Sequence, residues 1–480
     1  MITSTGTASA GWSRERVEVT ARRICDPALI GDWLAAGAGA DKQAVRDLLQ
    51  RAKAMKGLSP AEAAVLIQVD DPGLREEITS AARKVHETSY GRRIGVFAPV
   101  CPTNRCVDDC LYCPLRRGNA RLRRTKATTR DIQREIVGLL DEGHRHVLLV
   151  FGNDRSGIHY VRDMIWSTYG ARSGMRQIQR VDLNMDPVPG DDLRQITDAA
   201  ALGTYHVFQE TYDPRTYAKL HPSGPKSDYA WRLTCHDRAI EIGLEDVGLG
   251  VLLGAHDYRF DVTALVAHTG HLEDTYGQLP VAITYPRMIA APNAPASQET
   301  ARQFSDEDFK FVVAVTRLAL PYTHITLSTP ATREVRIELY TIGVSAVSVG
   351  SQSYPGVYTA DGDPEAAGAL RIGRPRALEE LVYRMCEAGF LPNFCVGCYV
   401  KRRRAAIRAE DSPLERIRER CAPNALLCLK DYLMDYASSE TQNIGGRLIQ
   451  QELAKLPEKL RGTILELMEE AEAGIRGQLL

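Results

Sequence analysis

The sequence lacks the features that mark membrane, secreted and disordered proteins. Its 480 residues contain no uninterrupted apolar run of about 18 residues, so we expect no membrane-spanning helix. Residues 1–19 lack the apolar core of a secretory signal, and we expect a cytoplasmic protein. The 60 Lys and Arg residues balance 61 Asp and Glu residues, and a net charge of −1 provides no field to attract nucleic acid or a membrane. With 44% hydrophobic residues, the composition excludes wholesale disorder and predicts a globular protein.

The cysteines are the most informative residues. There are eleven of them, an odd number, and without an export signal metal binding or catalysis explains them better than disulfides do. One group comprises Cys101, Cys106, Cys110 and Cys113, and a second comprises Cys395, Cys398, Cys421 and Cys428. Cys25, Cys235 and Cys386 stand alone, and we expect them to be buried as small apolar side chains.

The order of expected elements divides the chain into three parts. Residues 1–90 carry apolar residues at helical spacing and predict a helical N-terminal extension. In residues 91–385, helical segments alternate with eight short β-rich runs, at 94–100, 147–151, 180–185, 205–210, 247–253, 281–285, 324–328 and 346–350. This alternation predicts an α/β fold, a (β/α)8 TIM barrel, with a doubly wound open sheet as the alternative. Residues 386–480 predict a helical C-terminal segment that contains the second cysteine group.

The first cysteine group directly follows the first expected strand, on the face where barrels place their chemistry. Cys106, Cys110 and Cys113 are spaced C-x3-C-x2-C on one short loop. Three thiolates there suit a [4Fe–4S] cluster with one iron left open, because a fully ligated cluster takes four cysteines. A zinc site with Cys101 as fourth ligand, or chance clustering, is the alternative.

This motif at the end of a first barrel strand resembles the signature of the radical S-adenosylmethionine (SAM) enzymes. The resemblance implies that the three cysteines hold a [4Fe–4S] cluster, that its open iron chelates SAM, and that Tyr112 lies near the adenine. It also implies an external electron donor of the ferredoxin or flavodoxin type. Reductive cleavage of SAM in this family yields a 5′-deoxyadenosyl radical, which abstracts a hydrogen atom from the substrate.

The second cysteine group extends the resemblance. Alone, Cys395-x2-Cys398 followed by Cys421 would fit zinc as well. Together with residues 203–212, 220–229, 246–258 and 344–350, however, it is similar to the HydG family of [FeFe]-hydrogenase maturases, whereas the thiamine-pathway tyrosine lyase ThiH is similar over the barrel alone. The resemblance implies that Cys395, Cys398 and Cys421 hold an auxiliary [4Fe–4S] cluster able to carry a bridging cysteine and an extra iron. His268 matches the region that supplies a ligand to that iron, with His271 as the alternative.

The expected SAM site departs from the family pattern. After the second strand the family has a glycine and a glutamate that holds the SAM ammonium, whereas this chain has Gly152 followed by Asn153. Asn153 offers no charge, and charge-assisted hydrogen bonds are about twice as strong as neutral ones. Either Asp154 takes over the role of the glutamate or SAM binds more weakly. Gln209 and Glu210, at the end of the fourth expected strand, resemble family residues near the cofactor.

The expected substrate pocket departs as well. The tyrosine lyases carry Ser-Thr-Arg-Glu after the seventh strand, and here Ser328 and Thr329 are followed by Pro330. Arg333 is the candidate carboxylate clamp if the loop is lengthened, because a planar bidentate arginine suits a carboxylate. Arg287 is the arginine retained after the sixth strand.

The sequence therefore predicts a radical SAM lyase acting on a free amino acid. By resemblance, the default is Cα–Cβ cleavage of L-tyrosine to p-cresol and dehydroglycine, with conversion of the fragment to carbon monoxide and cyanide at the auxiliary cluster. A metallocofactor acceptor protein is then an expected partner. A related enzyme with a remodelled pocket for another amino acid, in natural-product or metallocofactor biosynthesis, is the first alternative. A non-catalytic iron–sulfur or metal-fragment scaffold is the second.

Overall fold

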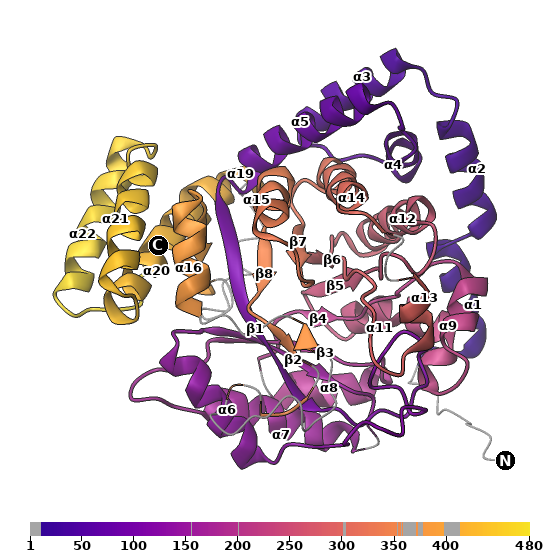
Figure 1. Cartoon of the computed structure of the whole chain (residues 1–480), viewed down its shortest axis with the longest axis horizontal. Helices are drawn as coiled ribbons and strands as arrows, with labels where there is room; N and C mark the ends of the chain where they lie inside the picture. Colours follow the sequence, from indigo (N-terminus) through magenta and orange to yellow (C-terminus); the bar gives the residue numbers. More distant parts are fainter. Residues whose placement is uncertain are drawn as a thin grey trace.

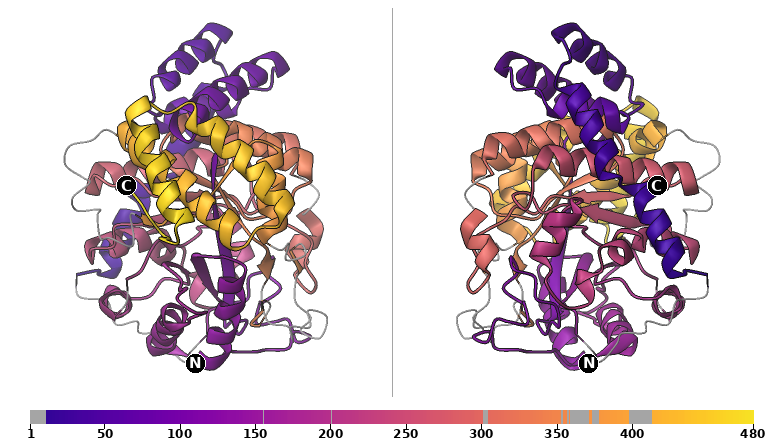
Figure 2. Two further views of the ribbon diagram at one scale, coloured as in Figure 1. Left: turned by 90° about the vertical axis from the view of Figure 1, so that its left-hand side faces the viewer. Right: turned by 90° about the vertical axis from the view of Figure 1, so that its right-hand side faces the viewer.

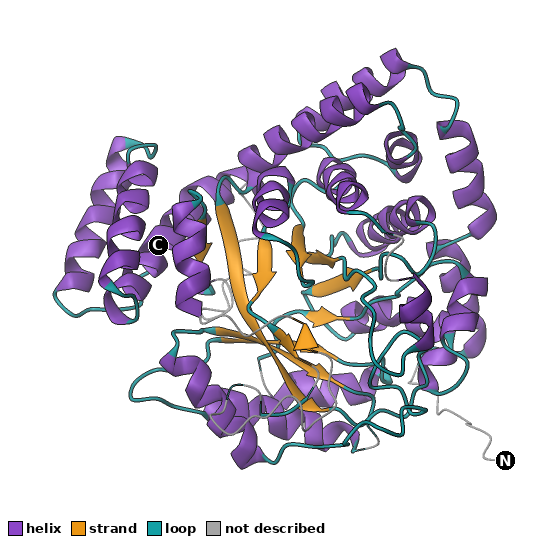
Figure 3. Cartoon of the chain, viewed as in Figure 1, coloured by secondary structure: helices purple, strands orange, loops and turns teal. Residues whose placement is uncertain are grey.

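The barrel forms as expected. The computed structural model of the chain describes residues 11–154, 156–199, 201–300, 304–352, 354–356, 358, 371–372, 378–397 and 413–480. Eight parallel strands follow one another in chain order, and β1 also pairs with β8, which closes the barrel (Figures 1 and 3). They are β1 (Arg93–Thr103), β2 (His146–Phe151), β3 (Arg180–Asn184), β4 (Tyr205–His206), β5 (Val247–Gly250), β6 (Ala282–Thr284), β7 (His324–Leu327) and β8 (Ala346–Ser348). The (β/α)8 prediction is confirmed, and the open sheet is excluded.

Helices surround the strands because each buries an apolar stripe against the sheet. In α6 (Thr129–Asp141), a capping box between Thr128 and Asp131 starts the helix, and Ile132, Ile136 and Leu139 are buried. The other helices of this ring are α7 (Gly157–Gly170), α8 (Gly190–Ala199), α9 (Pro214–Leu220), α10 (Tyr229–Leu233), α11 (Cys235–Glu241), α12 (Tyr258–Tyr276), α13 (Pro295–Thr300), α14 (Asp306–Ala319) and α15 (Arg333–Ile342). No helix in the described part of the chain is both long and apolar enough to cross a membrane.

The N-terminal helices form an arc along one side of the barrel (Figures 1 and 2). They are α1 (Arg14–Ile24), α2 (Pro27–Gly37), α3 (Lys42–Lys53), α4 (Pro60–Ile67) and α5 (Pro72–Ser89). Each begins at a Ser or Asp whose side chain accepts a backbone N–H, as Asp71 does from Leu74 at α5.

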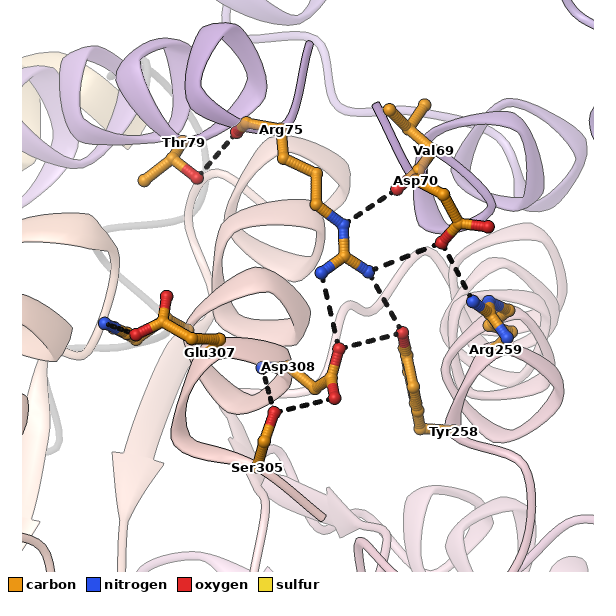
Figure 4. Close-up of polar contacts among 10 residues, drawn as sticks. Val69, Asp70, Arg75, Thr79, Tyr258, Arg259, Ser305, Glu307 and Asp308 are labelled. Atoms are coloured by element: carbon orange, nitrogen blue, oxygen red, sulfur yellow. Dashed lines mark hydrogen bonds and ion pairs between the residues drawn. The ribbon is translucent and has the colours of Figure 1, made fainter. Parts of the chain in front are cut away.

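Arg75 joins this arc to the barrel helices (Figure 4). Its Nε donates to the Val69 carbonyl at 2.8 Å, and its two other nitrogens reach Asp308 of α14 and the Tyr258 hydroxyl of α12 at 3.4 and 3.3 Å. The guanidinium also lies 4.2 Å from the ring centre of Phe311. One partly buried side chain therefore links three helices.

The C-terminal part contributes a strand to the barrel sheet. Here β11 (Leu391–Asn393) runs parallel to the first residues of β1, with Arg93 opposite Leu391 and Gly95 opposite Asn393. The residues that follow, Phe394 and Cys395, are thereby brought to the end of the barrel where β1 begins. The remaining elements are β9 (Ser351–Gln352), β10 (Arg371–Ile372), α16 (Leu378–Glu387), α19 (Pro413–Arg416), the π-helical turn η2 (Ile417–Cys421), α20 (Ala422–Asp435), α21 (Ser439–Leu453) and α22 (Glu458–Glu472). The last three helices stack beside the barrel, opposite the N-terminal arc (Figure 1).

Candidate active site

The first cysteine triad lies on the loop after β1, and neighbouring loops hold that loop in place. The Val107 N–H donates to the Asn153 carbonyl at 2.8 Å, and the Leu111 N–H donates to the Leu220 carbonyl at 2.9 Å. The loop is therefore tied to the segments that follow β2 and β4. Because parallel strands end at the same edge, these segments share the catalytic face of the barrel.

The chemistry of the triad suits a metal cluster. Burial raises the pKa of the Cys106 thiol to about 12 and also raises that of Cys110 and Cys113, so bound metal has to supply the charge that favours thiolates. Cys101 lies within β1, where its thiol contacts the Thr103 carbonyl at 3.3 Å. In the described residues no three Cys, His, Asp or Glu side chains converge on a single metal ion. A cubane cluster does not require such convergence, because each thiolate binds a different iron.

Two of the expected cofactor residues, Tyr112 and Glu210, lie together beside the triad. The Tyr112 hydroxyl is 3.0 Å from His221 Nε2, and Lys226 Nζ lies 5.7 Å from the Tyr112 ring centre. Lys226 also forms an ion pair of 2.6 Å with Glu210, whose φ of 72° is unusual for a residue with a side chain. Gln209 is buried, and its Nε2 has no hydrogen-bond partner among the described residues. An orphaned buried amide beside Glu210 in the sequence fits a ligand that supplies an acceptor.

Asn153 contacts a carboxyl group that the sequence analysis overlooked. Its Nδ2 donates to Asp108 Oδ2 at 2.8 Å, and Asp108 Oδ1 accepts the Lys226 backbone N–H at 2.8 Å. Burial and a hydrogen bond with Asp186 raise the pKa of Asp108 to about 6. Asp108 lies inside the cysteine motif, between Cys106 and Cys110. An acidic residue between two expected cluster ligands is the only sequence feature that could have pointed to a role for it in this site.

Asp154, by contrast, is engaged by its own loop. Its Oδ2 accepts the Thr103 hydroxyl at 3.1 Å, and its Oδ1 accepts both the backbone N–H, at 2.5 Å, and the hydroxyl of Ser156. The carboxylate thus caps the turn into α7 and ties that turn to β1.

A single cavity of about 380 Å³ runs through the barrel interior. At the catalytic face, its wall includes Tyr112 and Cys113, and at the end where β1 begins it includes Asn393 and Cys395. The same cavity is therefore lined by Cys113 of the first cysteine group and by Cys395 of the second.

Two of the three expected substrate residues line this cavity. Ser328 lies on the wall with Arg287, whose guanidinium pairs with Asp306 and donates to the Pro330 carbonyl at 2.8 Å. Arg333 instead begins α15 on the outer surface, where it pairs with Glu387 at 2.7 Å and is about half exposed. It is not among the described residues that line the cavity. The displaced arginine therefore does not have the position that we expected of a carboxylate clamp.

The second cysteine group collects where β1 begins. Burial lowers the pKa of Arg93, the partly buried first residue of β1, while Cys421 and Cys395 act to raise it, so both thiols lie within electrostatic range of that residue. The Cys395 thiol also hydrogen-bonds that of Cys428 on α20. Cys398 lies outside the described residues. Cys25, Cys235 and Cys386 are buried, as expected for bystanders.

His268 lies away from this group. It is buried in α12, with Nδ1 2.9 Å from the Tyr212 hydroxyl and its ring centre 5.4 Å from that of His236. Its Nε2 has no partner among the described residues, but His268 is not on the described wall of the cavity. The geometry gives the expected iron-ligand role no support. The alternative, His271, pairs with Asp237 at 2.7 Å.

Comparisons with known proteins agree with this arrangement. The Radical SAM superfamily profile matches residues 100–264, and the Biotin and Thiamin Synthesis associated domain matches residues 284–391. The 2-iminoacetate synthase of Escherichia coli is 27% identical over 322 residues, which cover 66% of this chain and 82% of the relative. The [FeFe] hydrogenase maturase subunit HydE of Thermotoga maritima is 26% identical over 283 residues, which cover 56% of this chain and 75% of the relative.

Solved structures extend the likeness to nearly the whole chain. A crystal structure of HydG, a maturase of the [FeFe]-hydrogenase, superposes with a TM-score of 0.87 at 34% identity, covering 95% of this chain and 99% of that one. HydG from Carboxydothermus hydrogenoformans gives a TM-score of 0.78 at 29% identity, covering 95% of this chain and 100% of that one. The chain therefore belongs to the radical SAM superfamily and is a HydG-like radical SAM enzyme that also resembles 2-iminoacetate synthase.

Proposed function

We propose that the enzyme cleaves the Cα–Cβ bond of a free amino acid, with L-tyrosine as the default substrate. The products are p-cresol and dehydroglycine, which is the 2-imino acid of two carbons. This fragment is then converted to carbon monoxide and cyanide at a second cluster. The observation that carries the proposal is the single cavity whose wall includes both Cys113 and Cys395. It offers a continuous path by which a fragment made at one end can reach the other.

The residues of the first site fit the cofactors of the family. Cys106, Cys110 and Cys113 are the proposed ligands of the [4Fe–4S] cluster, which, when bound, supplies the electron that cleaves SAM. Tyr112, Gln209 and Glu210 are the proposed contacts for SAM, and the orphaned Nε2 of Gln209 is the clearest sign of a missing partner. An external protein of the ferredoxin or flavodoxin type is the proposed source of the electron.

Asp108 is the proposed source of the carboxylate that the family glutamate supplies. Asn153 occupies the glutamate position and donates to Asp108, so the negative charge stands one hydrogen bond away from its usual place. Asp154 is fully engaged by Thr103 and Ser156, which makes it the weaker candidate for a contact with the SAM ammonium. The chain thus retains a carboxylate in the SAM site although its familiar motif is altered.

The substrate is proposed to bind where Arg287 and Ser328 line the cavity. Asp306 and the Pro330 carbonyl fix the Arg287 guanidinium, so this arginine presents a rigid positive group to the substrate. With Arg333 on the outer surface, only one of the expected arginines faces the cavity. This favours, as a second candidate function, the same radical chemistry on another amino acid.

The second site is proposed to hold an auxiliary [4Fe–4S] cluster on Cys395, Cys398 and Cys421. The approach of Cys395 and Cys421 to Arg93 supports this part of the proposal. The extra iron and its bridging cysteine stay a prediction, as does a metallocofactor acceptor protein that takes up the product.

The test is anaerobic turnover of the cluster-loaded enzyme with each of the twenty amino acids and a reductant. Formation of 5′-deoxyadenosine with p-cresol from tyrosine supports the leading proposal. A different amino acid that stimulates 5′-deoxyadenosine formation without p-cresol supports the second candidate. No SAM cleavage under any condition contradicts both and favours the non-catalytic scaffold.

A further inference from the structure

The waist of the barrel is polar where such barrels are ordinarily packed with bulky aliphatic side chains. His146 of β2, Arg180 and Asp182 of β3, and His206 of β4 all line the cavity, together with Thr204. We call these five residues the waist network. The strand register sets them side by side, with His146 opposite Arg180 and Asn184 opposite His206. The proposed function above assigns none of them a role.

Asp182 lies at the centre of the network. Its Oδ1 accepts from Arg180 Nε at 2.7 Å and from the Thr204 backbone N–H at 2.8 Å. Its Oδ2 accepts from His146 Nε2 at 2.8 Å, with His206 Nε2 at 3.5 Å. Burial alone would raise the pKa of Asp182. The charge of Arg180 and the hydrogen bond from His146 nevertheless hold this pKa well below its usual range. The carboxylate is therefore ionised, and it orients an arginine and two imidazoles around the cavity.

Two glycines make room for this network. A Cβ at Gly203 would lie 2.1 Å from Asp182 Oδ1, and a Cβ at Gly248 would lie 2.3 Å from His206 Nδ1. No side chain fits at either position while the network keeps its present geometry. The surrounding strands are thus shaped around these polar groups.

The two imidazoles of the network still have unused hydrogen-bonding capacity. His206 is 7% exposed, and its Nδ1 has no partner among the described residues. Burial lowers the pKa of His146, so that ring is neutral, and since its Nε2 donates to Asp182 its Nδ1 carries a lone pair. Buried polar atoms are rarely left unpaired, and such atoms on a cavity wall mark a place where a ligand supplies the partner.

We propose that the waist network binds a small carboxylate that also carries an N–H group, and specifically the two-carbon imino acid left after side-chain cleavage. The positive charge of Arg180 attracts the carboxylate. The imidazole lone pairs accept the N–H. The inference rests on the proposed function, because that reaction generates such a fragment at one end of the cavity that the network lines.

Retention at the waist also protects the fragment from water. Hydrolysis adds water to the C=N bond, the oxygen stays on carbon as the aldehyde of glyoxylate, and the nitrogen leaves as ammonium after taking up one proton. No oxidant or reductant is consumed. A waist that fails to hold the fragment therefore releases glyoxylate in place of the final products.

The test uses glyoxylate as a stable probe that shares the carboxylate and the two-carbon size. In water glyoxylate is hydrated at its aldehyde carbon, and the O–H groups of the hydrate donate to the imidazole lone pairs in place of the N–H. Its binding to the cluster-loaded enzyme is measured by calorimetry for wild type, Arg180→Lys, His206→Phe and the control Thr326→Val, which changes a cavity residue outside the network. Loss of the planar guanidinium or of the imidazole weakens binding by about tenfold or more, as expected for lost charge-assisted hydrogen bonds. Thr326→Val binds as wild type does. If His206→Phe fails to fold, as judged by thermal unfolding, His206→Gln replaces it and shows intermediate affinity.

Turnover in the same preparations separates this inference from the proposed function. The ratio of free glyoxylate to p-cresol rises several-fold in Arg180→Lys and His206→Phe relative to Thr326→Val. Equal affinity for glyoxylate in all variants, or no saturable binding in wild type, overturns the waist site even if p-cresol forms. Glyoxylate binding that is lost in the variants, with no p-cresol from any preparation, overturns the tyrosine reaction and leaves the waist site standing.

Discussion

Moving one carboxylate between two neighbouring positions tests how this enzyme holds SAM. Asn153 stands where the family has a glutamate, and its Nδ2 donates to Asp108 at 2.8 Å. Asp108→Asn leaves the site without the proposed carboxylate, whereas Asp108→Asn combined with Asn153→Glu returns a carboxylate from the familiar side. We expect the first change to weaken SAM binding and the second to restore it.

The magnitude follows from the loss of one charge-assisted contact. A hydrogen bond to a charged group contributes about 1.5–3 kcal/mol, so the Kd for SAM rises roughly 10- to 150-fold in Asp108→Asn. Asn153→Glu alone sets a third carboxyl beside Asp108 and Asp186, which already share a hydrogen bond, and it weakens binding by repulsion. Asn153→Glu thus weakens SAM binding in the wild-type background and strengthens it in the Asp108→Asn background. A double-mutant cycle measures this coupling directly.

The assay is anaerobic calorimetry of SAM binding to the cluster-loaded protein, with the electron paramagnetic resonance spectrum of the reduced cluster as a second readout. Asp154→Asn is the matched control, because that carboxyl group is engaged by Thr103 and Ser156. Unchanged affinity in Asp108→Asn, or a double variant no better than the single one, would refute the assignment of the carboxylate to Asp108.

Three further changes test other parts of the molecule. Cys395→Ala keeps forming p-cresol but no cyanide, whereas Cys386→Ala forms both, as product analysis by chromatography checks. Arg75→Ala lowers the free energy of unfolding by about 1–3 kcal/mol through lost helix contacts, and Arg83→Ala, which breaks one exposed ion pair, lowers it by about 0.5 kcal/mol or less. Burial raises the pKa of Asp261 from 3.8 to about 8, so the folded state holds a proton that the unfolded state has lost, and wild type loses stability as the pH rises from 4 to 8. Denaturation of Asp261→Asn across that range shows a shallower decline, and identical pH profiles would contradict the assignment.

Much of the fold was predictable because short stretches of sequence carry the patterns of the barrel strands and of the cysteine motif. The β-rich runs were expected close to their observed positions, and the cysteine motif was expected on the loop that follows β1. The strand β11 was missed because three residues including Pro392 carry no strand pattern of their own. It forms because the first residues of β1 offer an unpaired edge.

The positions of the site residues were predictable where a residue directly follows a strand, and not where the length of a loop decides its position. Arg287 and Ser328 follow strands directly, and both reach the cavity. Arg333 lies five residues beyond Ser328, and capping of α15 by Thr332 carries it to the outer surface. Asp108 and the waist network were overlooked because their meaning depends on contacts across strands, which periodicity does not report. Asn153 shows the same limit, since the carboxylate to which it donates, that of Asp108, lies on another loop.

The most direct measurement of the central claim is a single anaerobic turnover with L-tyrosine, SAM, reductant and the enzyme carrying both clusters. Mass spectrometry of the quenched reaction quantifies 5′-deoxyadenosine and p-cresol together. The proposed reaction predicts equal amounts of the two products, with p-cresol absent when tyrosine is omitted. Tyrosine-independent 5′-deoxyadenosine with no p-cresol would contradict it.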